Sequence, residues 1–246
     1  MTTFRIIGPG RAGSAMQTAL TQAGWLGRAP VGRGESLTGA AEGVDYLLVT
    51  VRDAEIEAVA EAVDPRPDTV VVHLAGSAGP ELLATHPRRA AVHPLAALTA
   101  ERGADQLRSG IWFGVDAAPE ALPAAEELVS VLGGHALTVT AAQRGLYHAT
   151  ASVAANHLVA LLGQVERLAD RLGLPSQAFL ALARGNLENV SALGAARALT
   201  GPVARGDWAT VERHRRSLPP DEKALYESLA TEAARLAGRK LPPALP

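Results

Sequence analysis

The sequence has no cysteine and only two lysines, Lys223 and Lys240. The absence of cysteine excludes disulfides, thiolate metal ligands, iron–sulfur clusters and a cysteine nucleophile. Because both lysines lie near the C-terminus, the first 222 residues cannot supply a catalytic lysine. We expect no metal site, and the lack of cysteine is typical of a reducing cytoplasm.

The chain also has no large excess of positive or negative charge, and it has no long apolar run. Its 246 residues include 23 lysines and arginines against 25 aspartates and glutamates, for a formal net charge of −2. We therefore expect neither nucleic acid nor an anionic membrane as a partner. No apolar run approaches the roughly 18 residues that span a bilayer, and no signal peptide is visible at the N-terminus. The expected location is cytoplasmic.

The first part of the chain alternates strand and helix patterns. Apolar runs predict strands at 4–8, around 29–32, and at 45–51, 69–74, 90–93, 111–115 and 136–139. Helices are predicted at 12–23, 54–63 and 119–132, and Asp53 is expected to cap the second of them. This alternation predicts an α/β fold, a parallel sheet with both faces covered by helices.

After Thr140 the pattern becomes helical throughout. One near-continuous helix is predicted at 141–172, ended by Gly173, and further helices at 176–199, 208–217 and 220–237, followed by an irregular tail at 241–246. We therefore expect an N-terminal dinucleotide-binding Rossmann domain at 1–140. An all-α domain for substrate binding and dimerisation is expected at 141–246.

A glycine-rich turn follows the first predicted strand. Gly8-Pro9-Gly10-Arg11-Ala12-Gly13 matches G-x-G-x-x-G and opens the first helix. Gly8 would permit a tight turn, Gly10 would let backbone approach a pyrophosphate, and Gly13 would let helix and strand pack closely. Phosphates would then lie on the helix N-terminus, beside Arg11 and Ala12. The alternative is a purely structural strand–helix turn.

The residues that follow favour NADP over NAD. The expected end of the second strand presents Arg33 rather than an acid, and Arg33 is suited to the 2′-phosphate of NADP. Arg28 could assist, whereas Glu35 keeps NAD possible. Val51 and Ala75, at the ends of the third and fourth strands, are expected to line the cofactor.

Polar residues gather where a ligand of such a sheet would bind. His93 follows the fifth strand and is restricted by Pro94, so its imidazole could donate to a substrate. Tyr147, His148, Ser152 and Asn156 lie on the long helix, and the last three are spaced for one stripe. We expect His148 to deliver a proton and Asn156 to orient the substrate. A buried polar network without chemistry is the alternative.

A second polar cluster interrupts the later helices. It runs from Thr200 to Asp207, and Arg205 within it could bind a substrate carboxylate with two hydrogen bonds. Asp207 could cap the following helix or hold Arg205. Thr200 and Tyr147 are further candidates for substrate binding, together with Ser152.

Together these residues resemble a bacterial family of Rossmann-like oxidoreductases whose all-α C-terminal domain has no assigned function. The family lies in the 6-phosphogluconate dehydrogenase-like group, whose architectures include pyrroline-5-carboxylate reductase, ketopantoate reductase and prephenate dehydrogenase. The matching motifs span nearly the whole chain: Gly8–Gly13, His93-Pro94-Leu95, Tyr147-His148-Ala149, Asn156, Asn189, Ala198–Pro202, Arg205-Gly206-Asp207, Thr210 and His214. The resemblance implies a homodimer formed through the helical domain.

Three positions depart from the patterns of these relatives. Ala155 replaces a serine that the family often has before the asparagine, and Ala75 replaces the serine of a His-x-Ser-Gly turn. Ser152 stands where reductases of β-hydroxyacids carry a lysine, which argues against the lysine mechanism.

The sequence therefore predicts a reductase that uses NADP, or alternatively NAD, on a small carbonyl or imine substrate with a carboxylate. The expected substrate is either a 2-keto acid such as ketopantoate or a cyclic imine. One alternative is a nucleotide-binding regulatory or scaffold protein without turnover. Another is a helical dimerisation module with a vestigial α/β domain.

Overall fold

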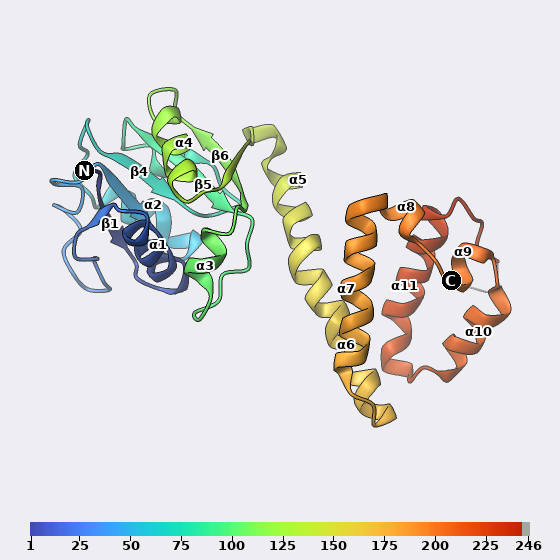
Figure 1. The fold of residues 1–246 in the computed structure, drawn as a ribbon. Helices are drawn as coiled ribbons and strands as arrows, with labels where there is room; N and C mark the ends of the chain where they lie inside the picture. Colours follow the sequence, from blue (N-terminus) through green and yellow to red (C-terminus); the bar gives the residue numbers. More distant parts are fainter. Residues whose placement is uncertain (243–246) are drawn as a thin grey trace. The chain divides into compact units, whose positions relative to one another are not determined.

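A computed structural model describes residues 1–242, whose contacts form two compact units (Figure 1). The first unit is Met1–Ala155, and the second begins at Asn156. The division falls inside the long helical segment, after the boundary near residue 140 expected from the sequence. The reason is that the first part of that segment packs on the sheet.

The first unit is a seven-stranded sheet with helices on both faces. Its strands, in the spatial order β2-β1-β3-β4-β5-β6-β7, are β1 (Thr3–Ile7), β2 (Leu26–Gly27), β3 (Tyr46–Val49), β4 (Val70–His73), β5 (Arg89–Pro94), β6 (Trp112–Ala117) and β7 (His135–Thr138). Its helical segments are α1 (Arg11–Gln22), η1 (Asp53–Glu55), α2 (Ile56–Glu61), η2 (Pro80–Leu83), α3 (Gly103–Leu107), α4 (Leu122–Val131) and α5 (Ala141–Ser152).

Strands β3 and β4 are buried on both faces, as their continuous apolar runs predict, and β1 is buried in the same way at Ile6 and Ile7. Leu48 and Val72 pack with residues of α1, α3 and α4, while Leu47 and Val71 pack with residues of α2 and η2. Successive side chains point to opposite faces of a strand, so each strand contributes to both layers. The predicted α/β class with covered faces is confirmed.

The last two strands run against the rest of the sheet. β5 pairs with β6 in the antiparallel direction, with His93 opposite Gly114, and β6 pairs with β7 in parallel. β6 therefore begins at the edge where β1 and β3–β5 end, and β7 ends at the opposite edge. Helix α5 starts there and runs back, which returns its middle to the carboxyl ends of β4 and β5.

Two local expectations are wrong. The second strand forms at Leu26–Gly27 rather than around 29–32, where only a single bridge joins Val31 to Ile7. Asp53 caps no helix, because its Oδ2 accepts a hydrogen bond from the Ser77 hydroxyl at 3.0 Å.

The described residues of the second unit form helices joined by short loops, without a strand. A π-helical segment, η3 (Val153–His157), joins α5 to α6 (Leu158–Leu172), which ends at Gly173 as predicted. The remaining helices are α7 (Ser176–Leu193), α8 (Ala195–Ala198), α9 (Pro202–Arg205), α10 (Trp208–Ser217) and α11 (Pro220–Leu236). Gly194 divides the helix expected over 176–199. Leu241 and Pro242 are irregular as expected, and the rest of that predicted tail lies outside the described residues.

Candidate functional site

The glycine turn is built so that two of its positions exclude a side chain. Gly8 has φ +84°, and a Cβ there would lie 2.8 Å from Cγ1 of Val51. A Cβ on Gly13 would lie 2.4 Å from the Gly8 carbonyl oxygen. The Thr50 hydroxyl donates to that same oxygen at 2.7 Å and so fixes the turn against β3. The tight turn and the close packing expected of Gly8 and Gly13 are both present.

Gly10, unlike Gly8 and Gly13, borders open space. Among the described residues, no atom lies within 4 Å of the position of a Cβ at Gly10, and no side chain caps the start of α1. The first N–H groups of a helix and its dipole favour an anion. Arg11 and Ala12 open this helix, so the backbone here can accept a phosphate group.

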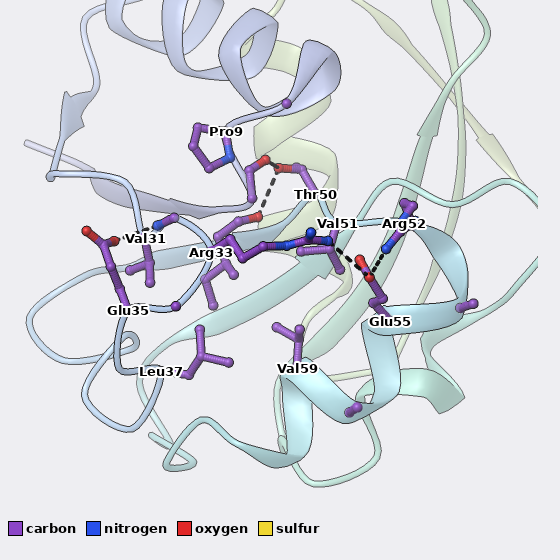
Figure 2. Close-up of a pocket in the computed structure, with 17 residues that line it drawn as sticks. Pro9, Val31, Arg33, Glu35, Leu37, Thr50, Val51, Arg52, Glu55 and Val59 are labelled. Atoms are coloured by element: carbon purple, nitrogen blue, oxygen red, sulfur yellow. Dashed lines mark hydrogen bonds and ion pairs between the residues drawn. The ribbon is translucent and has the colours of Figure 1, made fainter.

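Beside this turn lies a cavity of about 740 Å³ (Figure 2). The labelled side chains of Val31, Leu37, Val51 and Val59 form an apolar wall. The charged lining residues are Arg33, Glu35, Arg52 and Glu55. The cavity thus combines an apolar wall with charged groups.

Two arginines share one carboxylate in this cavity. Nη2 of Arg33 lies 3.7 Å from Oε1 of Glu55, and Arg52 donates to the same oxygen (Figure 2). That hydrogen bond from Arg52 lowers the pKa of Glu55. The side chain of Arg33 is 86% exposed, so it is available to a ligand. Glu35 is engaged differently, because its Oε2 accepts the Gly32 N–H at 2.6 Å.

Sequence reasoning missed Arg52 and Glu55. The available signal was the position of Arg52, which directly follows the strand run ending at Val51. Residues after β3 lie at the carboxyl edge of the sheet, next to the turn after β1.

A second group of side chains gathers where β4 and β5 end. The Tyr147 hydroxyl on α5 lies 2.8 Å from Nδ1 of His93. A Cβ on Gly114, opposite His93 on β6, would lie 2.3 Å from that hydroxyl. Glycine at 114 therefore admits the tyrosine ring.

His148 joins the same group from the next position of α5. The rings of His93 and His148 are 6.0 Å apart between centroids and nearly perpendicular. A Cβ on Gly76 would lie 2.7 Å from Nε2 of His93 and 2.9 Å from Cδ2 of His148. The structure thus brings His93, Tyr147 and His148 together beside the loop that contains Ala75 and Gly76.

Burial sets the protonation of this group. Desolvation, with the nearby His148 and Arg144 as smaller causes, lowers the pKa of His93 to about 4. Burial also raises the pKa of Tyr147. At neutral pH His93 is therefore uncharged and Tyr147 keeps its hydroxyl proton.

A buried ion pair beneath this group was also missed. Nη2 of Arg144 lies 2.9 Å from Oδ2 of Asp116, and the arginine side chain is only 6% exposed. An arginine near the start of a predicted helix looks like a solvated surface residue, so the sequence contains no signal for its burial. His73 lies nearby, with Nε2 bonded to the Gly79 carbonyl at 2.8 Å.

The remaining predicted residues lie elsewhere. Ser152 ends α5 and is half-buried, and Asn156 lies in η3, where π-helical turns replace the regular spacing assumed for the stripe. Thr200 and Arg205, both exposed, belong to the second unit. Asp207 caps α10 by accepting from the Thr210 N–H at 3.1 Å. Of its two expected roles, the structure therefore shows the cap.

Residues 1–242 contain neither a metal-binding cluster nor a helix that could span a membrane. In this part of the chain, no cluster of three or more His, Asp or Glu side chains is placed to hold a metal ion. Nor does any helix here have the length and apolarity required to cross a membrane.

Solved structures share the fold over nearly the whole chain. TM1727 from Thermotoga maritima is 24% identical, with a TM-score of 0.74. The alignment covers 96% of this chain and 98% of TM1727. BF3122 from Bacteroides fragilis, a candidate NADP oxidoreductase, is 21% identical with a TM-score of 0.78. The alignment covers 95% of this chain and 98% of BF3122. Pyrroline carboxylate reductase from Plasmodium falciparum, with NADP bound, is 11% identical with a TM-score of 0.63, covering 96% and 98%.

At these identities the similarity shows a shared fold, a Rossmann-type sheet followed by a helical part. No curated protein matches the chain. A family model described as domain of unknown function DUF2520 matches residues 111–233, which is half of the sequence. The match spans β6, β7 and most of the helices that follow. The chain belongs to the DUF2520 family.

Proposed function

We propose that the protein is an NADP(H)-dependent reductase acting on a small carbonyl or imine substrate that carries a carboxylate. The observation that carries this proposal is the cavity of about 740 Å³ beside the glycine turn, lined by Arg33 and Arg52. Doubly wound sheets bind dinucleotides at this turn, and ligand pockets have volumes of ~300–1,000 Å³. The Plasmodium falciparum reductase of the same fold has NADP bound, which supports the proposal.

The residues present fit such a cofactor. The uncapped start of α1 and the open space at Gly10 leave room for a pyrophosphate on backbone N–H groups. Gly8 and Gly13 hold this turn, Arg11 and Ala12 supply its N–H groups, and Val51 and Ala75 would line the bound molecule. When bound, the nicotinamide supplies or accepts the hydride.

Arg33 and Arg52 favour NADP over NAD. A guanidinium binds a phosphomonoester with charge-assisted hydrogen bonds, and both arginines lie at the cavity with one carboxylate between them. Glu35 would accept a ribose hydroxyl in an NAD enzyme, but its carboxylate is bonded to the Gly32 N–H. We therefore assign the 2′-phosphate to Arg33, with Arg52 as a second ligand.

The chain's own chemistry would lie at His93, Tyr147 and His148. Reduction of a carbonyl or imine adds a hydride to carbon and a proton to oxygen or nitrogen. We assign that proton to His148, which lies beside the uncharged His93. His93 would donate a hydrogen bond to the same atom, and Tyr147 with Ser152 would complete the substrate pocket.

Residues of the second unit would recognise the rest of the substrate. We assign orientation of the substrate to Asn156 and binding of its carboxylate to Arg205, with Thr200 and Asp207 beside Arg205 in sequence. These roles, like a cytoplasmic location, are proposals from the sequence pattern.

We further propose a homodimer formed through the helical unit. Val159, Leu182 and Leu187 are 68%, 65% and 53% exposed. Large apolar side chains exposed over neighbouring helices are typical of an interaction surface. Sedimentation equilibrium of the wild-type protein and of Leu182→Glu tests this. A wild-type monomer at micromolar concentration contradicts it.

Titration with NADPH and NADH, followed by nicotinamide fluorescence, tests the proposed cofactor. We expect NADPH to bind at least tenfold more tightly than NADH. Replacing both Arg33 and Arg52 with glutamine should abolish this preference. Arg66→Gln, at an exposed arginine paired with Glu42 away from the cavity, is the matched control. Saturable binding of neither nucleotide would overturn the proposal.

The catalytic part has its own test, a screen of 2-keto acids and cyclic imines with NADPH. For an accepted substrate, His148→Ala should lower kcat while NADPH affinity stays the same. An unchanged kcat in this variant would remove His148 as proton donor. Tight NADPH binding without turnover of any compound in the screen would favour a regulatory nucleotide-binding protein.

A further inference from the structure

Arg144 is buried, but some of its guanidinium N–H groups have no hydrogen-bond acceptor among the described residues. Its side chain is 6% exposed, and Nη2 alone is bonded, to Asp116 at 2.9 Å and to the Val139 carbonyl at 3.4 Å. Among the described residues, none accepts a hydrogen bond from its buried Nε or Nη1. Buried, unpartnered donors cost stability, and apolar residues often replace a buried ion pair without loss. Arg144 is therefore a poor choice for stability alone.

The pair sets the register of α5 on β6. Arg144 and Tyr147 are three positions apart on α5 and so share one face of the helix. Asp116 and Gly114 are two positions apart on β6 and so share one face of the strand. Arg144 binds Asp116, and the Tyr147 hydroxyl lies 2.3 Å from the position that a Cβ on Gly114 would take. The ion pair therefore holds the tyrosine in place one helical turn away.

That position decides how His93 is bonded. Gly114 is the partner of His93 across β5 and β6, and the Tyr147 hydroxyl reaches Nδ1 of His93 at 2.8 Å. An uncharged imidazole has a single N–H. The backbone of Gly114 and, as a smaller cause, the positive charge of Arg144 act on the phenol oxygen. Both interact with its lone pairs, which directs the hydroxyl proton towards Nδ1. The N–H of His93 is then on Nε2, the nitrogen that lies beside Gly76.

We propose that Arg144 is a positioning residue for the proposed reduction. Through Asp116 it holds Tyr147 on Nδ1 of His93, so that Nε2–H faces the substrate as an uncharged hydrogen-bond donor. This inference rests on the proposed function for its role in catalysis. The arrangement of Arg144, Tyr147 and His93 can be tested without any substrate.

Several charged or titratable groups act on His93. They are His148, Arg144, Asp53, His73 and Tyr147. His73 is kept uncharged by burial, which lowers its pKa, and Asp53 is bonded to the Ser77 hydroxyl. Arg144 is the permanent cation of this group, so its removal should raise the pKa of His93.

Nitrogen-15 NMR of labelled histidine tests the proposal, because it identifies which ring nitrogen carries the hydrogen. We expect wild-type His93 to be the Nε2–H tautomer at pH 7. In Arg144→Gln the Nδ1–H tautomer should appear, and the titration midpoint of His93 should rise by about one pH unit. Arg5→Gln is the matched control, since Arg5 also bonds backbone carbonyls in the first unit, those of Gly39 and Ala40.

Two more variants separate position from charge and from folding. Tyr147→Phe removes the hydroxyl, so the Nδ1–H tautomer of His93 should appear although Arg144 is intact. Arg144→Lys keeps the charge but not the geometry of the fork, so it should keep the low midpoint and lose the single tautomer. Wild-type behaviour of His93 in Arg144→Gln would overturn the proposal, as would an Nδ1–H tautomer in the wild-type protein.

Cofactor binding distinguishes failure of this inference from failure of the proposed function. Arg144→Gln should bind NADPH within about twofold of wild type, and with an accepted substrate its kcat should fall at unchanged NADPH affinity. If the wild-type protein binds no NADPH, the proposed reductase fails. In that case the His93 tautomer in the wild-type protein and in Arg144→Gln still shows whether Arg144 positions His93.

Discussion

The Tyr147 hydroxyl lies 2.8 Å from Nδ1 of His93, although 54 positions separate the two residues in the sequence. The contact exists because β6 and β7 reverse the direction of the sheet. Helix α5 consequently starts at the far edge and brings Tyr147 back to the end of β5. The group that we assign to catalysis is thus a product of sheet topology rather than of a local motif.

The pH dependence of stability should report the burial of His93. Its pKa is about 4 in the folded protein against an ordinary 6.5. Between these values the unfolded chain binds more protons, so the free energy of unfolding should fall as the pH drops from about 6.5 to about 4. The loss from this residue is at most about 3.4 kcal/mol. Urea unfolding at several pH values measures it.

The variant His93→Gln isolates this contribution from those of His73 and His86, whose pKa values are also lowered by burial. Its stability should change less with pH over the same range. His135→Gln, at an exposed histidine, is the control and should follow wild type. Equal slopes for His93→Gln and wild type would contradict the prediction.

Gly114→Ala should separate Tyr147 from His93. The new methyl group would lie 2.3 Å from the tyrosine oxygen, and such overpacking costs about 1–3 kcal/mol. We expect a lower free energy of unfolding, together with loss of the single His93 tautomer. Gly145→Ala is the matched control, because a Cβ there meets no atom within 4 Å. In the interior of α5 it should stabilise the protein by about 0.5–1 kcal/mol. A variant at 114 as stable as this control would contradict the prediction.

Glu55→Gln should tighten NADPH binding. Its carboxylate currently pairs with Arg33 and Arg52, and a phosphate must compete with it. Exposed ion pairs are weak, so we expect an increase in affinity of only about two- to fivefold. NADH affinity should be unchanged in fluorescence titrations. Glu57→Gln, at an exposed glutamate outside the cavity lining, is the control. Weaker NADPH binding by the Glu55 variant would mean that its carboxylate positions the arginines.

In the second unit, Glu222→Gln should lower the melting temperature. The Glu222 side chain is 3% exposed and accepts hydrogen bonds from Arg167 at 2.6 Å and from Gln164 at 3.0 Å. The bond from Arg167 is the main cause that lowers the pKa of Glu222 to about 2. Stability from this carboxylate should persist above pH 4.5 and disappear as the pH falls towards 2.

The neighbouring pair provides its control. Nη2 of Arg171 lies 2.9 Å from Oδ2 of Asp221, but the side chains of Asp221 and Arg171 are 62% and 50% exposed. Asp221→Asn should therefore lower the melting temperature less than Glu222→Gln in differential scanning calorimetry. Equal effects would show that burial does not matter at Glu222.

The sequence predicted the elements whose signals are local. The apolar run at 45–51 contains β3, and the helix predicted at 208–217 has the bounds of α10. The roles of Gly8 and Gly13 in the turn also followed from the motif, because a tight turn and close packing leave no room for a Cβ.

What could not be predicted depends on long-range contacts. The direction of β6 is decided by the path from Leu95 to Ile111, which carries no periodic signal. Arg144 and Arg52 look like solvated arginines, and only the fold shows that the first is buried and the second shares Glu55. Asp53 seemed a helix cap, but the Ser77 hydroxyl reaches it from the loop after β4.

The cavity and the histidine–tyrosine group come from separate stretches of the chain. Every residue that lines the cavity lies between Ile7 and Val59, whereas Tyr147 and His148 belong to α5. Under the proposed function, mutations in the first stretch can therefore change the preferred nucleotide without altering the proposed reacting groups, and mutations in α5 can do the reverse. Over evolutionary time, relatives with this architecture could thus exchange cofactor and reaction independently of each other.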